Sequence, residues 1–247
     1  MLGALLSTRF ASSSSALPPA SDAALPAPVR PAFAVPEPQG LGSSRDAARW
    51  TTVSQAVSVR SAPDPDASAI ASLDTRTPEG TANVVLVKES AADESGRLWI
   101  AVQVPALPQN LTGWVPRSAL DAYGFVRTRL VVDLERLTAT LLRGNRPIFR
   151  AAVGVGTTLS PTPTGEFYVR SKLWSLQSPF YGPLAFGTSA RSTVLTDWPD
   201  GGFVGIHGTN QPELLPGRVS HGCVRMRNED ILALGRLMPV GTPLTIR

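Results

Sequence analysis

Short runs in which apolar and polar residues alternate begin near Trp50 and recur to the end of the chain. Alternation with a period of two, interrupted by turn residues, is typical of half-buried β-strands. The pattern therefore predicts a mainly β protein. The predicted strands are Ala56–Arg60, Ala69–Leu73, Asn83–Val87, Leu98–Val102, Thr128–Asp133, Thr138–Leu142, Ile148–Val153 and Thr242–Ile246.

One stretch near the C-terminus has a helical period instead. Ile231, Leu234 and Met238 would lie on one face of a helix, and Pro239 would end it. Asn228 is a suitable N-cap, and the two acidic residues that follow it suit the helix dipole. The sequence thus predicts a short helix followed by a closing strand.

Three connecting segments have their own signals. The pair Gly144-Asn145 predicts a tight hairpin turn between two strands. The prolines and glycine of Pro161–Phe167 predict a shaped loop. The segment Ser178–Ser189, which includes Tyr181, mixes aromatic residues with turn formers and shows no clean period, so we expect a loop there.

The composition changes along the chain and predicts three parts. Residues 1–48 are rich in proline, alanine and serine and bury too little apolar surface to offset the entropy of ordering, so we expect a disordered linker or leader remnant. Residues 49–122 form a small β module, and residues 123–247 form a larger β-rich domain that contains the helix.

Charge and hydropathy limit the partners. The formal net charge is +4, but the basic residues are scattered and not interleaved with aromatic ones, so we expect no nucleic-acid partner. No stretch is long and apolar enough for an integral membrane segment. The apolar run Leu2–Leu6 is too short for a signal-peptide core, so an export signal is not evident. We expect a monomer.

The candidate chemistry lies in two histidines and one cysteine. The 247 residues contain a single cysteine, Cys223, which stands two positions after His221, and the other histidine is His207. A thiol is a strong nucleophile only as thiolate, and a nearby imidazole is the usual means of making one at neutral pH. Gly222, directly before the sulfur, lets the backbone turn tightly and leaves nearby amides free to face an oxyanion.

Three other interpretations use the same residues. A lone cysteine is often an inert, buried small hydrophobe. His207, His221 and Cys223 are also types that ligate zinc, although no second cysteine or histidine pair supports such a site. A hydrolytic cysteine protease would share the chemistry but not the sequence motifs.

The motifs around these residues resemble one known family. Gly205–Asn210, then Pro212, then Ser220–Met226, then Asn228 and Asp230 resemble the active-site signature of the L,D-transpeptidases with a YkuD-type catalytic domain. Pro161–Phe167 resembles a second motif of that family, and the predicted strands after Phe125 resemble its opening meander.

The resemblance implies roles for residues. Cys223 would be the nucleophile and His207 the base, with His221 and Gly222 at the oxyanion region and the carbonyl of Gly208 orienting His207. Three further residues would contact substrate, and no metal or other cofactor would be needed. The substrate-contacting residues are Ser220, Arg225 and Tyr181.

Two of these assignments keep an alternative. The guanidinium of Arg225 suits a carboxylate of the substrate, but it also suits a structural ion pair. Tyr181 lies where the family has a loop over its substrate groove, but the same loop is consistent with a surface loop held by a buried phenylalanine.

The smaller module resembles a different family. Val59–Pro63, Gly96–Trp99 and Gly113–Pro116 resemble bacterial SH3-like modules. The expected fold is thus a small SH3-like barrel followed by an L,D-transpeptidase catalytic domain. Trp99 and Trp114 fit core aromatics better than ligand contacts.

The resemblance implies a peptidoglycan L,D-transpeptidase of the cell envelope, outside the cytoplasm. Its partners would be peptidoglycan stem peptides: a donor tetrapeptide forms a thioester, and an acceptor amine resolves it. The product can be a cross-link between stems, a protein anchored to the wall or an exchanged D-amino acid, and the sequence does not distinguish them. The alternative function is a non-catalytic wall-binding protein with a degenerate transferase domain.

Overall fold

The computed structural model describes residues 39–41, 47–174, 178–192, 194 and 202–247. All of these residues belong to one compact unit, Pro31–Arg247. Most of the linker predicted for residues 1–48 lies outside the described residues. Within its described part, Gln39 and Gly40 pair with Ser90 and Glu89 as a short strand, and Ala48 begins a strand that pairs with Val126, so the linker prediction does not hold for these three residues.

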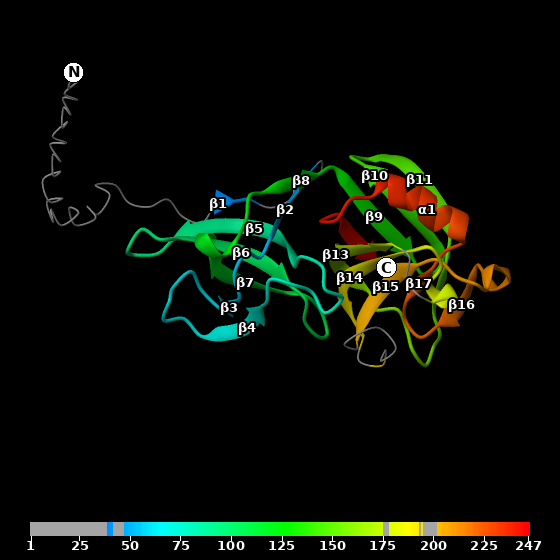
Figure 1. The fold of residues 1–247 in the computed structure, drawn as a ribbon, viewed down its shortest axis with the longest axis horizontal. Coiled ribbons are helices and arrows are strands. Elements are labelled where there is room, and N and C mark those ends of the chain that lie inside the picture. Colours follow the sequence, from blue (N-terminus) through cyan, green and yellow to red (C-terminus); the bar gives the residue numbers. More distant parts are fainter. Residues whose placement is uncertain (1–38, 42–46, 175–177, 193, 195–201) are drawn as a thin grey trace, which may run out of the picture. The chain divides into compact units, whose positions relative to one another are not determined.

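The first of two sheets contains eight strands, with neighbours in the order β4-β3-β7-β6-β5-β2-β8 and with β1 paired to β5 (Figure 1). A 3₁₀ turn, η1 (Arg117–Ala119), follows β7. The strands are β1 (Gln39–Gly40), β2 (Ala48–Thr52), β3 (Val57–Arg60), β4 (Ala69–Leu73), β5 (Val84–Ala92), β6 (Leu98–Val104), β7 (Leu111–Pro116) and β8 (Gly124–Val126).

The core of this sheet is built from the apolar positions of the predicted alternation. Trp99 is almost fully buried, and its indole N–H donates to Asp93 Oδ2 at 2.9 Å, while Trp114 is half-buried. A buried indole N–H needs an acceptor, so this bond suits a core aromatic. The strand pairings of the described residues run in an open path from β4 to β8, and the SH3-like assignment stays a prediction.

The second sheet contains ten strands in the order β11-β10-β9-β18-β13-β14-β15-β17-β12-β16 (Figure 1). The chain passes from the first sheet to the second between Val126, the end of β8, and Thr128, the start of β9. The strands are β9 (Thr128–Asp133), β10 (Thr138–Arg143), β11 (Arg146–Ala152), β12 (Gly154–Gly156), β13 (Gly165–Trp174), β14 (Leu184–Arg191), β15 (Phe203–His207), β16 (Gly217–Ser220), β17 (Val224–Arg225) and β18 (Pro243–Ile246).

The mainly β fold class is confirmed, and each predicted strand overlaps an observed one. The largest difference is at β5, which continues to Ala92. The predicted hairpin turn is also confirmed, because Arg143 and Arg146 pair across it and Gly144 has a φ of +58°.

The loop predicted for Ser178–Ser189 is wrong over its second half. A 3₁₀ turn, η2 (Pro179–Tyr181), is followed by β14, which begins at Leu184. The residues of β14 are buried from Leu184 to Ala190, because β14 is covered on both faces. A strand buried on both faces has no alternation, so a period-two pattern cannot reveal it.

The predicted helix is confirmed as α1 (Asn228–Leu237), which packs on β14. Gly235 provides the close contact, because a Cβ there would overlap the side chain of Leu184. Asn228 is not the N-cap, however: the helix cap is Arg227, without a side-chain hydrogen bond. No helix within the described residues is long and apolar enough to cross a membrane.

The last strand, β18, lies inside the sheet between β9 and β13. Leu244 and Ile246 point into the core, and the intervening Thr245 bonds Glu166 Oε2 at 2.9 Å on the exposed side. The C-terminal residues therefore join the opening strands of the domain to the strands that lead to the site.

We expect Leu244→Ala to lower the free energy of unfolding by about 2–5 kcal/mol, because it removes a fully buried side chain from this central strand. The neighbouring Thr245→Ala should cost only about 0.5 kcal/mol, because it loses an exposed bond. Urea unfolding monitored by tryptophan fluorescence measures both. Equal losses for the two variants would contradict the central place of β18.

Candidate active site

The site is built on two neighbouring parallel strands, β15 and β17 (Figure 1). His207 ends β15 and pairs with Arg225 of β17, while Ile206 pairs with Val224. Cys223 comes directly before β17 and lies two residues from Arg225, so the two share a face of the extended chain. The pairing brings together His207, Cys223 and Arg225, as the sequence predicted for the first two.

Cys223 is nearly buried, at 7% exposure, and its sulfur has a backbone donor. The N–H of Gly205 donates to Cys223 Sγ at 3.3 Å. This donor comes from the middle of β15, two residues before His207. A hydrogen bond to sulfur favours the thiolate over the thiol, so β15 supplies both a candidate base and a donor to the candidate nucleophile.

His207 is held in one orientation by its own chain. Its Nδ1 lies 2.6 Å from the carbonyl oxygen of Gly208, which can only accept, so Nδ1 carries the proton and donates. In the neutral imidazole the lone pair is then on Nε2. The carbonyl of Gly208 thus has the orienting position that the sequence predicted for it.

The imidazole is neutral at physiological pH. The pKa of His207 is lowered to about 4: burial is the main cause, the hydrogen bond to the Gly208 carbonyl opposes it, and the positive charge of Arg225 adds to it. His207 is only 1% exposed, which explains why burial is the main cause. A neutral imidazole can accept a proton from a thiol, as a general base must.

Aromatic rings of η2 cover the imidazole. The ring centroid of Tyr181 is 4.9 Å from that of His207 at an interplanar angle of 75°, and the ring centroid of Phe180 is 6.2 Å away. The guanidinium carbon of Arg225 lies 4.5 Å from the centroid of Phe180. Tyr181 therefore lies at the site, as predicted, and Phe180 joins it as a residue that the sequence did not single out.

The turn before Cys223 is held by Ser220. The hydroxyl of Ser220 donates to the carbonyl of Cys223 at 2.6 Å and accepts from the N–H of Gly222 at 3.1 Å. Gly222 has a φ of +125°, which a residue with a side chain rarely adopts. The glycine is thus required by the turn.

These bonds correct two expectations. The hydroxyl of Ser220, expected at the substrate, is buried and closes the turn. The N–H of Gly222, expected to face an oxyanion, is already bonded to that hydroxyl. The turn therefore positions Cys223, and Gly222 does not supply an oxyanion donor in this arrangement.

Thr162 supports the same turn from the segment before β13. The loop predicted for Pro161–Phe167 ends at Thr164, because β13 begins at Gly165. The hydroxyl of Thr162 accepts from the N–H of Gly156 at 2.8 Å and donates to the carbonyl of Gly222 at 2.8 Å. Both bonds are buried. The sequence predicted a shaped loop here but no role for it, because nothing in the sequence shows that Thr162 lies beside the Cys223 turn.

Asn228 supports His207 from the other side. Its Oδ1 accepts from the N–H of Thr209 at 3.0 Å and lies so close to Gly182 and Gly208 that a Cβ at either would overlap it. This contact explains why Asn228 is not the helix cap. The amide bonds the chain just after His207 instead of the first turn of α1.

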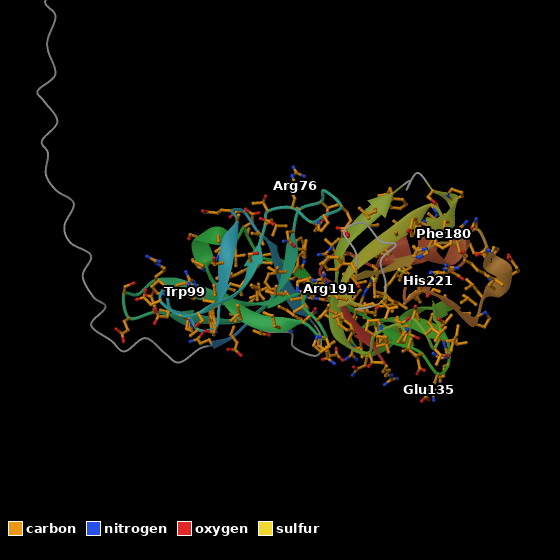
Figure 2. The ribbon with its side chains drawn as sticks, turned by 90° about the horizontal axis from the view of Figure 1, so that it is seen from below. Arg76, Trp99, Glu135, Phe180, Arg191 and His221 are labelled. Atoms are coloured by element: carbon orange, nitrogen blue, oxygen red, sulfur yellow. The ribbon has the colours of Figure 1, made fainter. Side chains whose placement is uncertain are left out.

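The remaining predicted residue, His221, lies exposed in the turn before Cys223; Figure 2 labels it together with Phe180. The described residues contain no group of three histidine, cysteine, aspartate or glutamate side chains that would hold a metal ion. The residues that the structure brings together are therefore Cys223, His207, Arg225 and Tyr181.

A thiol and a neutral, oriented imidazole on neighbouring strands of a mainly β domain are the parts of a cysteine-dependent acyl-transfer site. Residues 127–246 match the model of one such family, described as YkuD, L,D-transpeptidase catalytic domain. This part of the chain belongs to the L,D-transpeptidase family of catalytic domains.

Relatives of known name agree with this family. YkuD of Bacillus subtilis (strain 168), a protein assigned by name to the L,D-transpeptidases, is 35% identical over 117 residues, which are 47% of this chain and 64% of YkuD. YbiS of Escherichia coli (strain K12), also assigned to the L,D-transpeptidases, is 57% identical over 42 residues, which are 17% of this chain and 14% of YbiS. The chain thus spans less than two thirds of the relatives that it matches.

A solved structure is also similar. The catalytic domain of an L,D-transpeptidase from E. faecium is 26% identical to this chain, with 49% of this chain and 96% of that domain covered and a TM-score of 0.39. Family membership rests on the sequence matches.

The low pKa of His207 predicts a pH-dependent stability. In the unfolded chain this histidine binds a proton below about pH 6.5, but in the folded chain only below about pH 4. The contribution is therefore fully present above pH 6.5 and is lost as the pH falls toward 4, by about 3 kcal/mol in total. Urea unfolding of wild type and His207→Gln across this range measures it.

His207→Gln should lack this part of the pH dependence, whereas His221→Gln should retain it because His207 is still present. A wild-type curve that coincides with that of His207→Gln would contradict the buried, neutral state of His207.

Asn228 gives a second test. Asn228→Ala leaves the buried N–H of Thr209 without its acceptor, so we expect a loss of about 1–3 kcal/mol in unfolding free energy and a slower reaction of Cys223 with a thiol reagent. Asn228→Asp retains an acceptor oxygen and should lose less of both. Helical content by circular dichroism serves as the control, because an N-cap role would predict a loss of helix first.

Proposed function

We propose that the chain is a peptidoglycan L,D-transpeptidase that transfers an acyl group from a donor stem peptide through a thioester on Cys223. The observation that carries this proposal is the neutral imidazole of His207, oriented by the Gly208 carbonyl on the strand next to Cys223. The family match of residues 127–246 supplies the substrate class.

In the first half of the reaction, Nε2 of His207 takes the proton of the Cys223 thiol, and the sulfur attacks the carbonyl of a donor tetrapeptide. A bond forms between Sγ and the carbonyl carbon, and the carbonyl oxygen becomes an oxyanion. Because Gly222 N–H is bonded to Ser220, we assign the oxyanion donor to the N–H of Cys223 itself.

The tetrahedral species then breaks its carbon–nitrogen bond. Protonated His207 gives its proton to the departing amine of the terminal D-alanine, and the thioester remains. In the second half an acceptor amine, the side-chain amine of a diamino acid, attacks the thioester and passes its proton to Nε2 of His207. Cleavage of the carbon–sulfur bond forms the new amide and returns the thiol.

Two residues of the site suit substrate recognition. Arg225 offers a positive charge beside His207, which fits a carboxylate of the donor stem. Bound there, such a carboxylate would offset the effect of Arg225 on His207 and raise the proton affinity of the imidazole, which must hold a proton in mid-reaction. The ring of Tyr181 lines the approach to His207.

The same proposal places the protein in the cell envelope, outside the cytoplasm, where peptidoglycan is found, and treats it as a monomer. The rival function is a non-catalytic wall-binding protein with a degenerate transferase domain. The fixed tautomer of His207 and the donor to Cys223 Sγ favour the enzyme, since wall binding requires neither of them.

Acylation of Cys223 tests the proposal. A strained β-lactam carbonyl resembles the attacked amide, so a carbapenem should open on the sulfur and remain as a slowly hydrolysed thioester. Intact-mass measurement should show one added drug mass on the peptide that contains Cys223. The adduct should be absent in Cys223→Ala and form about 100-fold or more slowly in His207→Gln, which lacks the base.

The substrate is tested in the same protein. Incubation with purified disaccharide tetrapeptides should release D-alanine and give cross-linked dimers detectable by mass spectrometry. Folded wild-type protein that binds cell walls but forms neither the dimer nor the carbapenem adduct would establish the rival function instead.

A further inference from the structure

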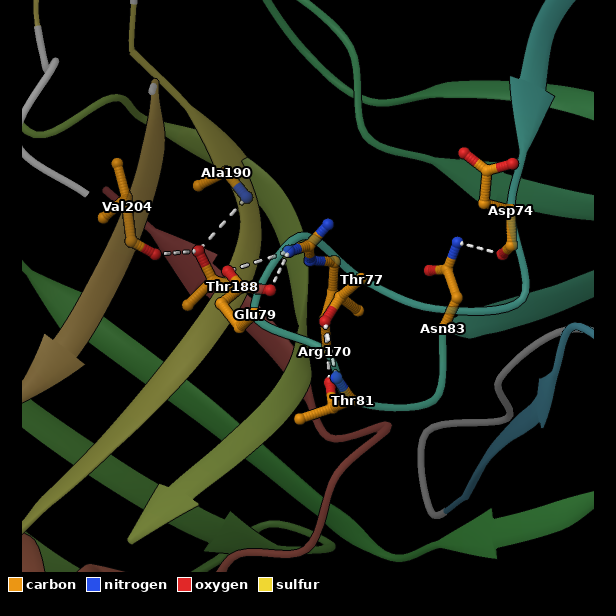
Figure 3. A network of polar contacts seen from close by, with 9 residues as sticks. All are labelled: Asp74, Thr77, Glu79, Thr81, Asn83, Arg170, Thr188, Ala190 and Val204. Atoms are coloured by element: carbon orange, nitrogen blue, oxygen red, sulfur yellow. Dashed lines mark hydrogen bonds and ion pairs between the residues drawn. The ribbon is translucent and has the colours of Figure 1, made fainter. Parts of the chain in front are cut away.

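A turn of the first sheet carries a charged residue into the second. The segment between β4 and β5 forms a tight turn in which Thr77 N–H donates to Thr81 O at 2.8 Å and the two threonine hydroxyls bond at 2.8 Å. Gly80 completes the turn with a φ of +79°. Glu79 lies at its tip, as Figure 3 shows.

Glu79 forms a buried ion pair with Arg170 of β13. One terminal nitrogen of Arg170 lies 3.3 Å from Oε1 and 3.2 Å from Oε2 of Glu79, and both side chains are only 4% exposed. Removing one partner of a buried pair leaves an uncompensated charge, which is strongly unfavourable. Arg191 adds a second positive charge nearby, which repels that of Arg170.

The guanidinium of Arg170 in turn contacts the strand that carries His207. Its carbon lies 3.9 Å from the ring centroid of Phe203, and the guanidinium of Arg191 lies 4.9 Å from the same centroid. Phe203 is the first residue of β15. The next residue, Val204, accepts a bond from the Thr188 hydroxyl at 2.6 Å (Figure 3).

Two residues after Phe203, the N–H of Gly205 bonds Cys223 Sγ, and two residues further lies His207. A shift at the start of this five-residue strand therefore reaches both the donor to the sulfur and the candidate base. We propose that Glu79 is a positioning residue for the active site: by pairing with Arg170 it holds that guanidinium on Phe203 and fixes β15. This inference rests on the proposed function only in that it treats Cys223 and His207 as the reacting groups.

Other contacts between the two sheets are independent of Glu79. The hydroxyl of Tyr168 donates to the carbonyl of Gln103 at 3.1 Å, and the amide of Gln103 donates to the carbonyl of Glu166 at 3.1 Å. Asn110 donates to the Ser189 hydroxyl at 2.7 Å. Loss of the Glu79 charge alone therefore leaves the sheets in contact, so its effect is local to Arg170 and β15.

The test compares Glu79→Gln, which keeps the shape and removes the charge, with Glu89→Gln, an exposed glutamate of the same sheet. The first readout is the rate at which iodoacetamide modifies Cys223 as a function of pH, which needs no transferase activity. We expect Glu79→Gln to lower this rate about 10-fold and to shift its pH profile. Glu89→Gln should stay within about twofold of wild type.

The second readout is kcat and KM for cross-linking of the tetrapeptide. Glu79→Gln should lower kcat with little change in KM, because the change misplaces the reacting groups rather than the contacts to the substrate. If iodoacetamide modifies Cys223 in the wild-type protein but no cross-link forms, the proposed function fails. The effect of Glu79→Gln on the reactivity of the thiol still tests the inference.

The double variant Glu79→Gln/Arg170→Gln separates positioning from simple charge compensation. It removes the uncompensated charge, so thermal stability should return toward wild type, but it also removes the contact on Phe203. We therefore expect Cys223 reactivity and kcat to remain low. Recovery of both along with stability would overturn the positioning role, as would a Glu79→Gln protein with wild-type reactivity of Cys223.

Discussion

The site depends on the parallel pairing of β15 with β17. The register pairs His207 with Arg225 and Ile206 with Val224, and the residues just before these pairs are joined by the hydrogen bond from Gly205 N–H to Cys223 Sγ. A slip by one residue would turn Cys223 away from His207 and move the buried Ile206 and Val224 out of the core. The apolar residues between the site residues therefore hold the register on which the chemistry depends.

Three polar contacts from outside these strands keep the pairing in place. Thr162 bonds the carbonyl of Gly222 before β17, Asn228 bonds the N–H of Thr209 after β15, and the Glu79–Arg170 pair lies at the start of β15. Each contact joins two residues that are at least 19 positions apart in the sequence. Buried polar groups lose more when unpaired than they gain when paired, so such contacts specify one arrangement more than they add stability.

The sequence predicted many of the strands, the helix, and the Cys223–His207 pair, because periodicity and rare residues are local signals. It did not predict β14 and β15 as strands, because burial on both faces removes the alternation. It placed Asn228 at the helix cap because the local preference of asparagine favours a cap. Only the folded chain brings the N–H of Thr209 within reach of the Asn228 side chain. Glu79 carried no signal at all, since nothing near it in the chain indicates that Arg170 will face it.

Burial determines what the site can do with its proton. At 1% exposure and beside Arg225, an imidazolium at His207 is unfavourable, so the resting site holds a neutral imidazole. On the sulfur side, the hydrogen bond from the Gly205 N–H to Cys223 Sγ favours a thiolate over a thiol. In a proton transfer from Cys223 to His207, Arg225 therefore opposes the imidazolium that would form, while the Gly205 N–H favours the thiolate.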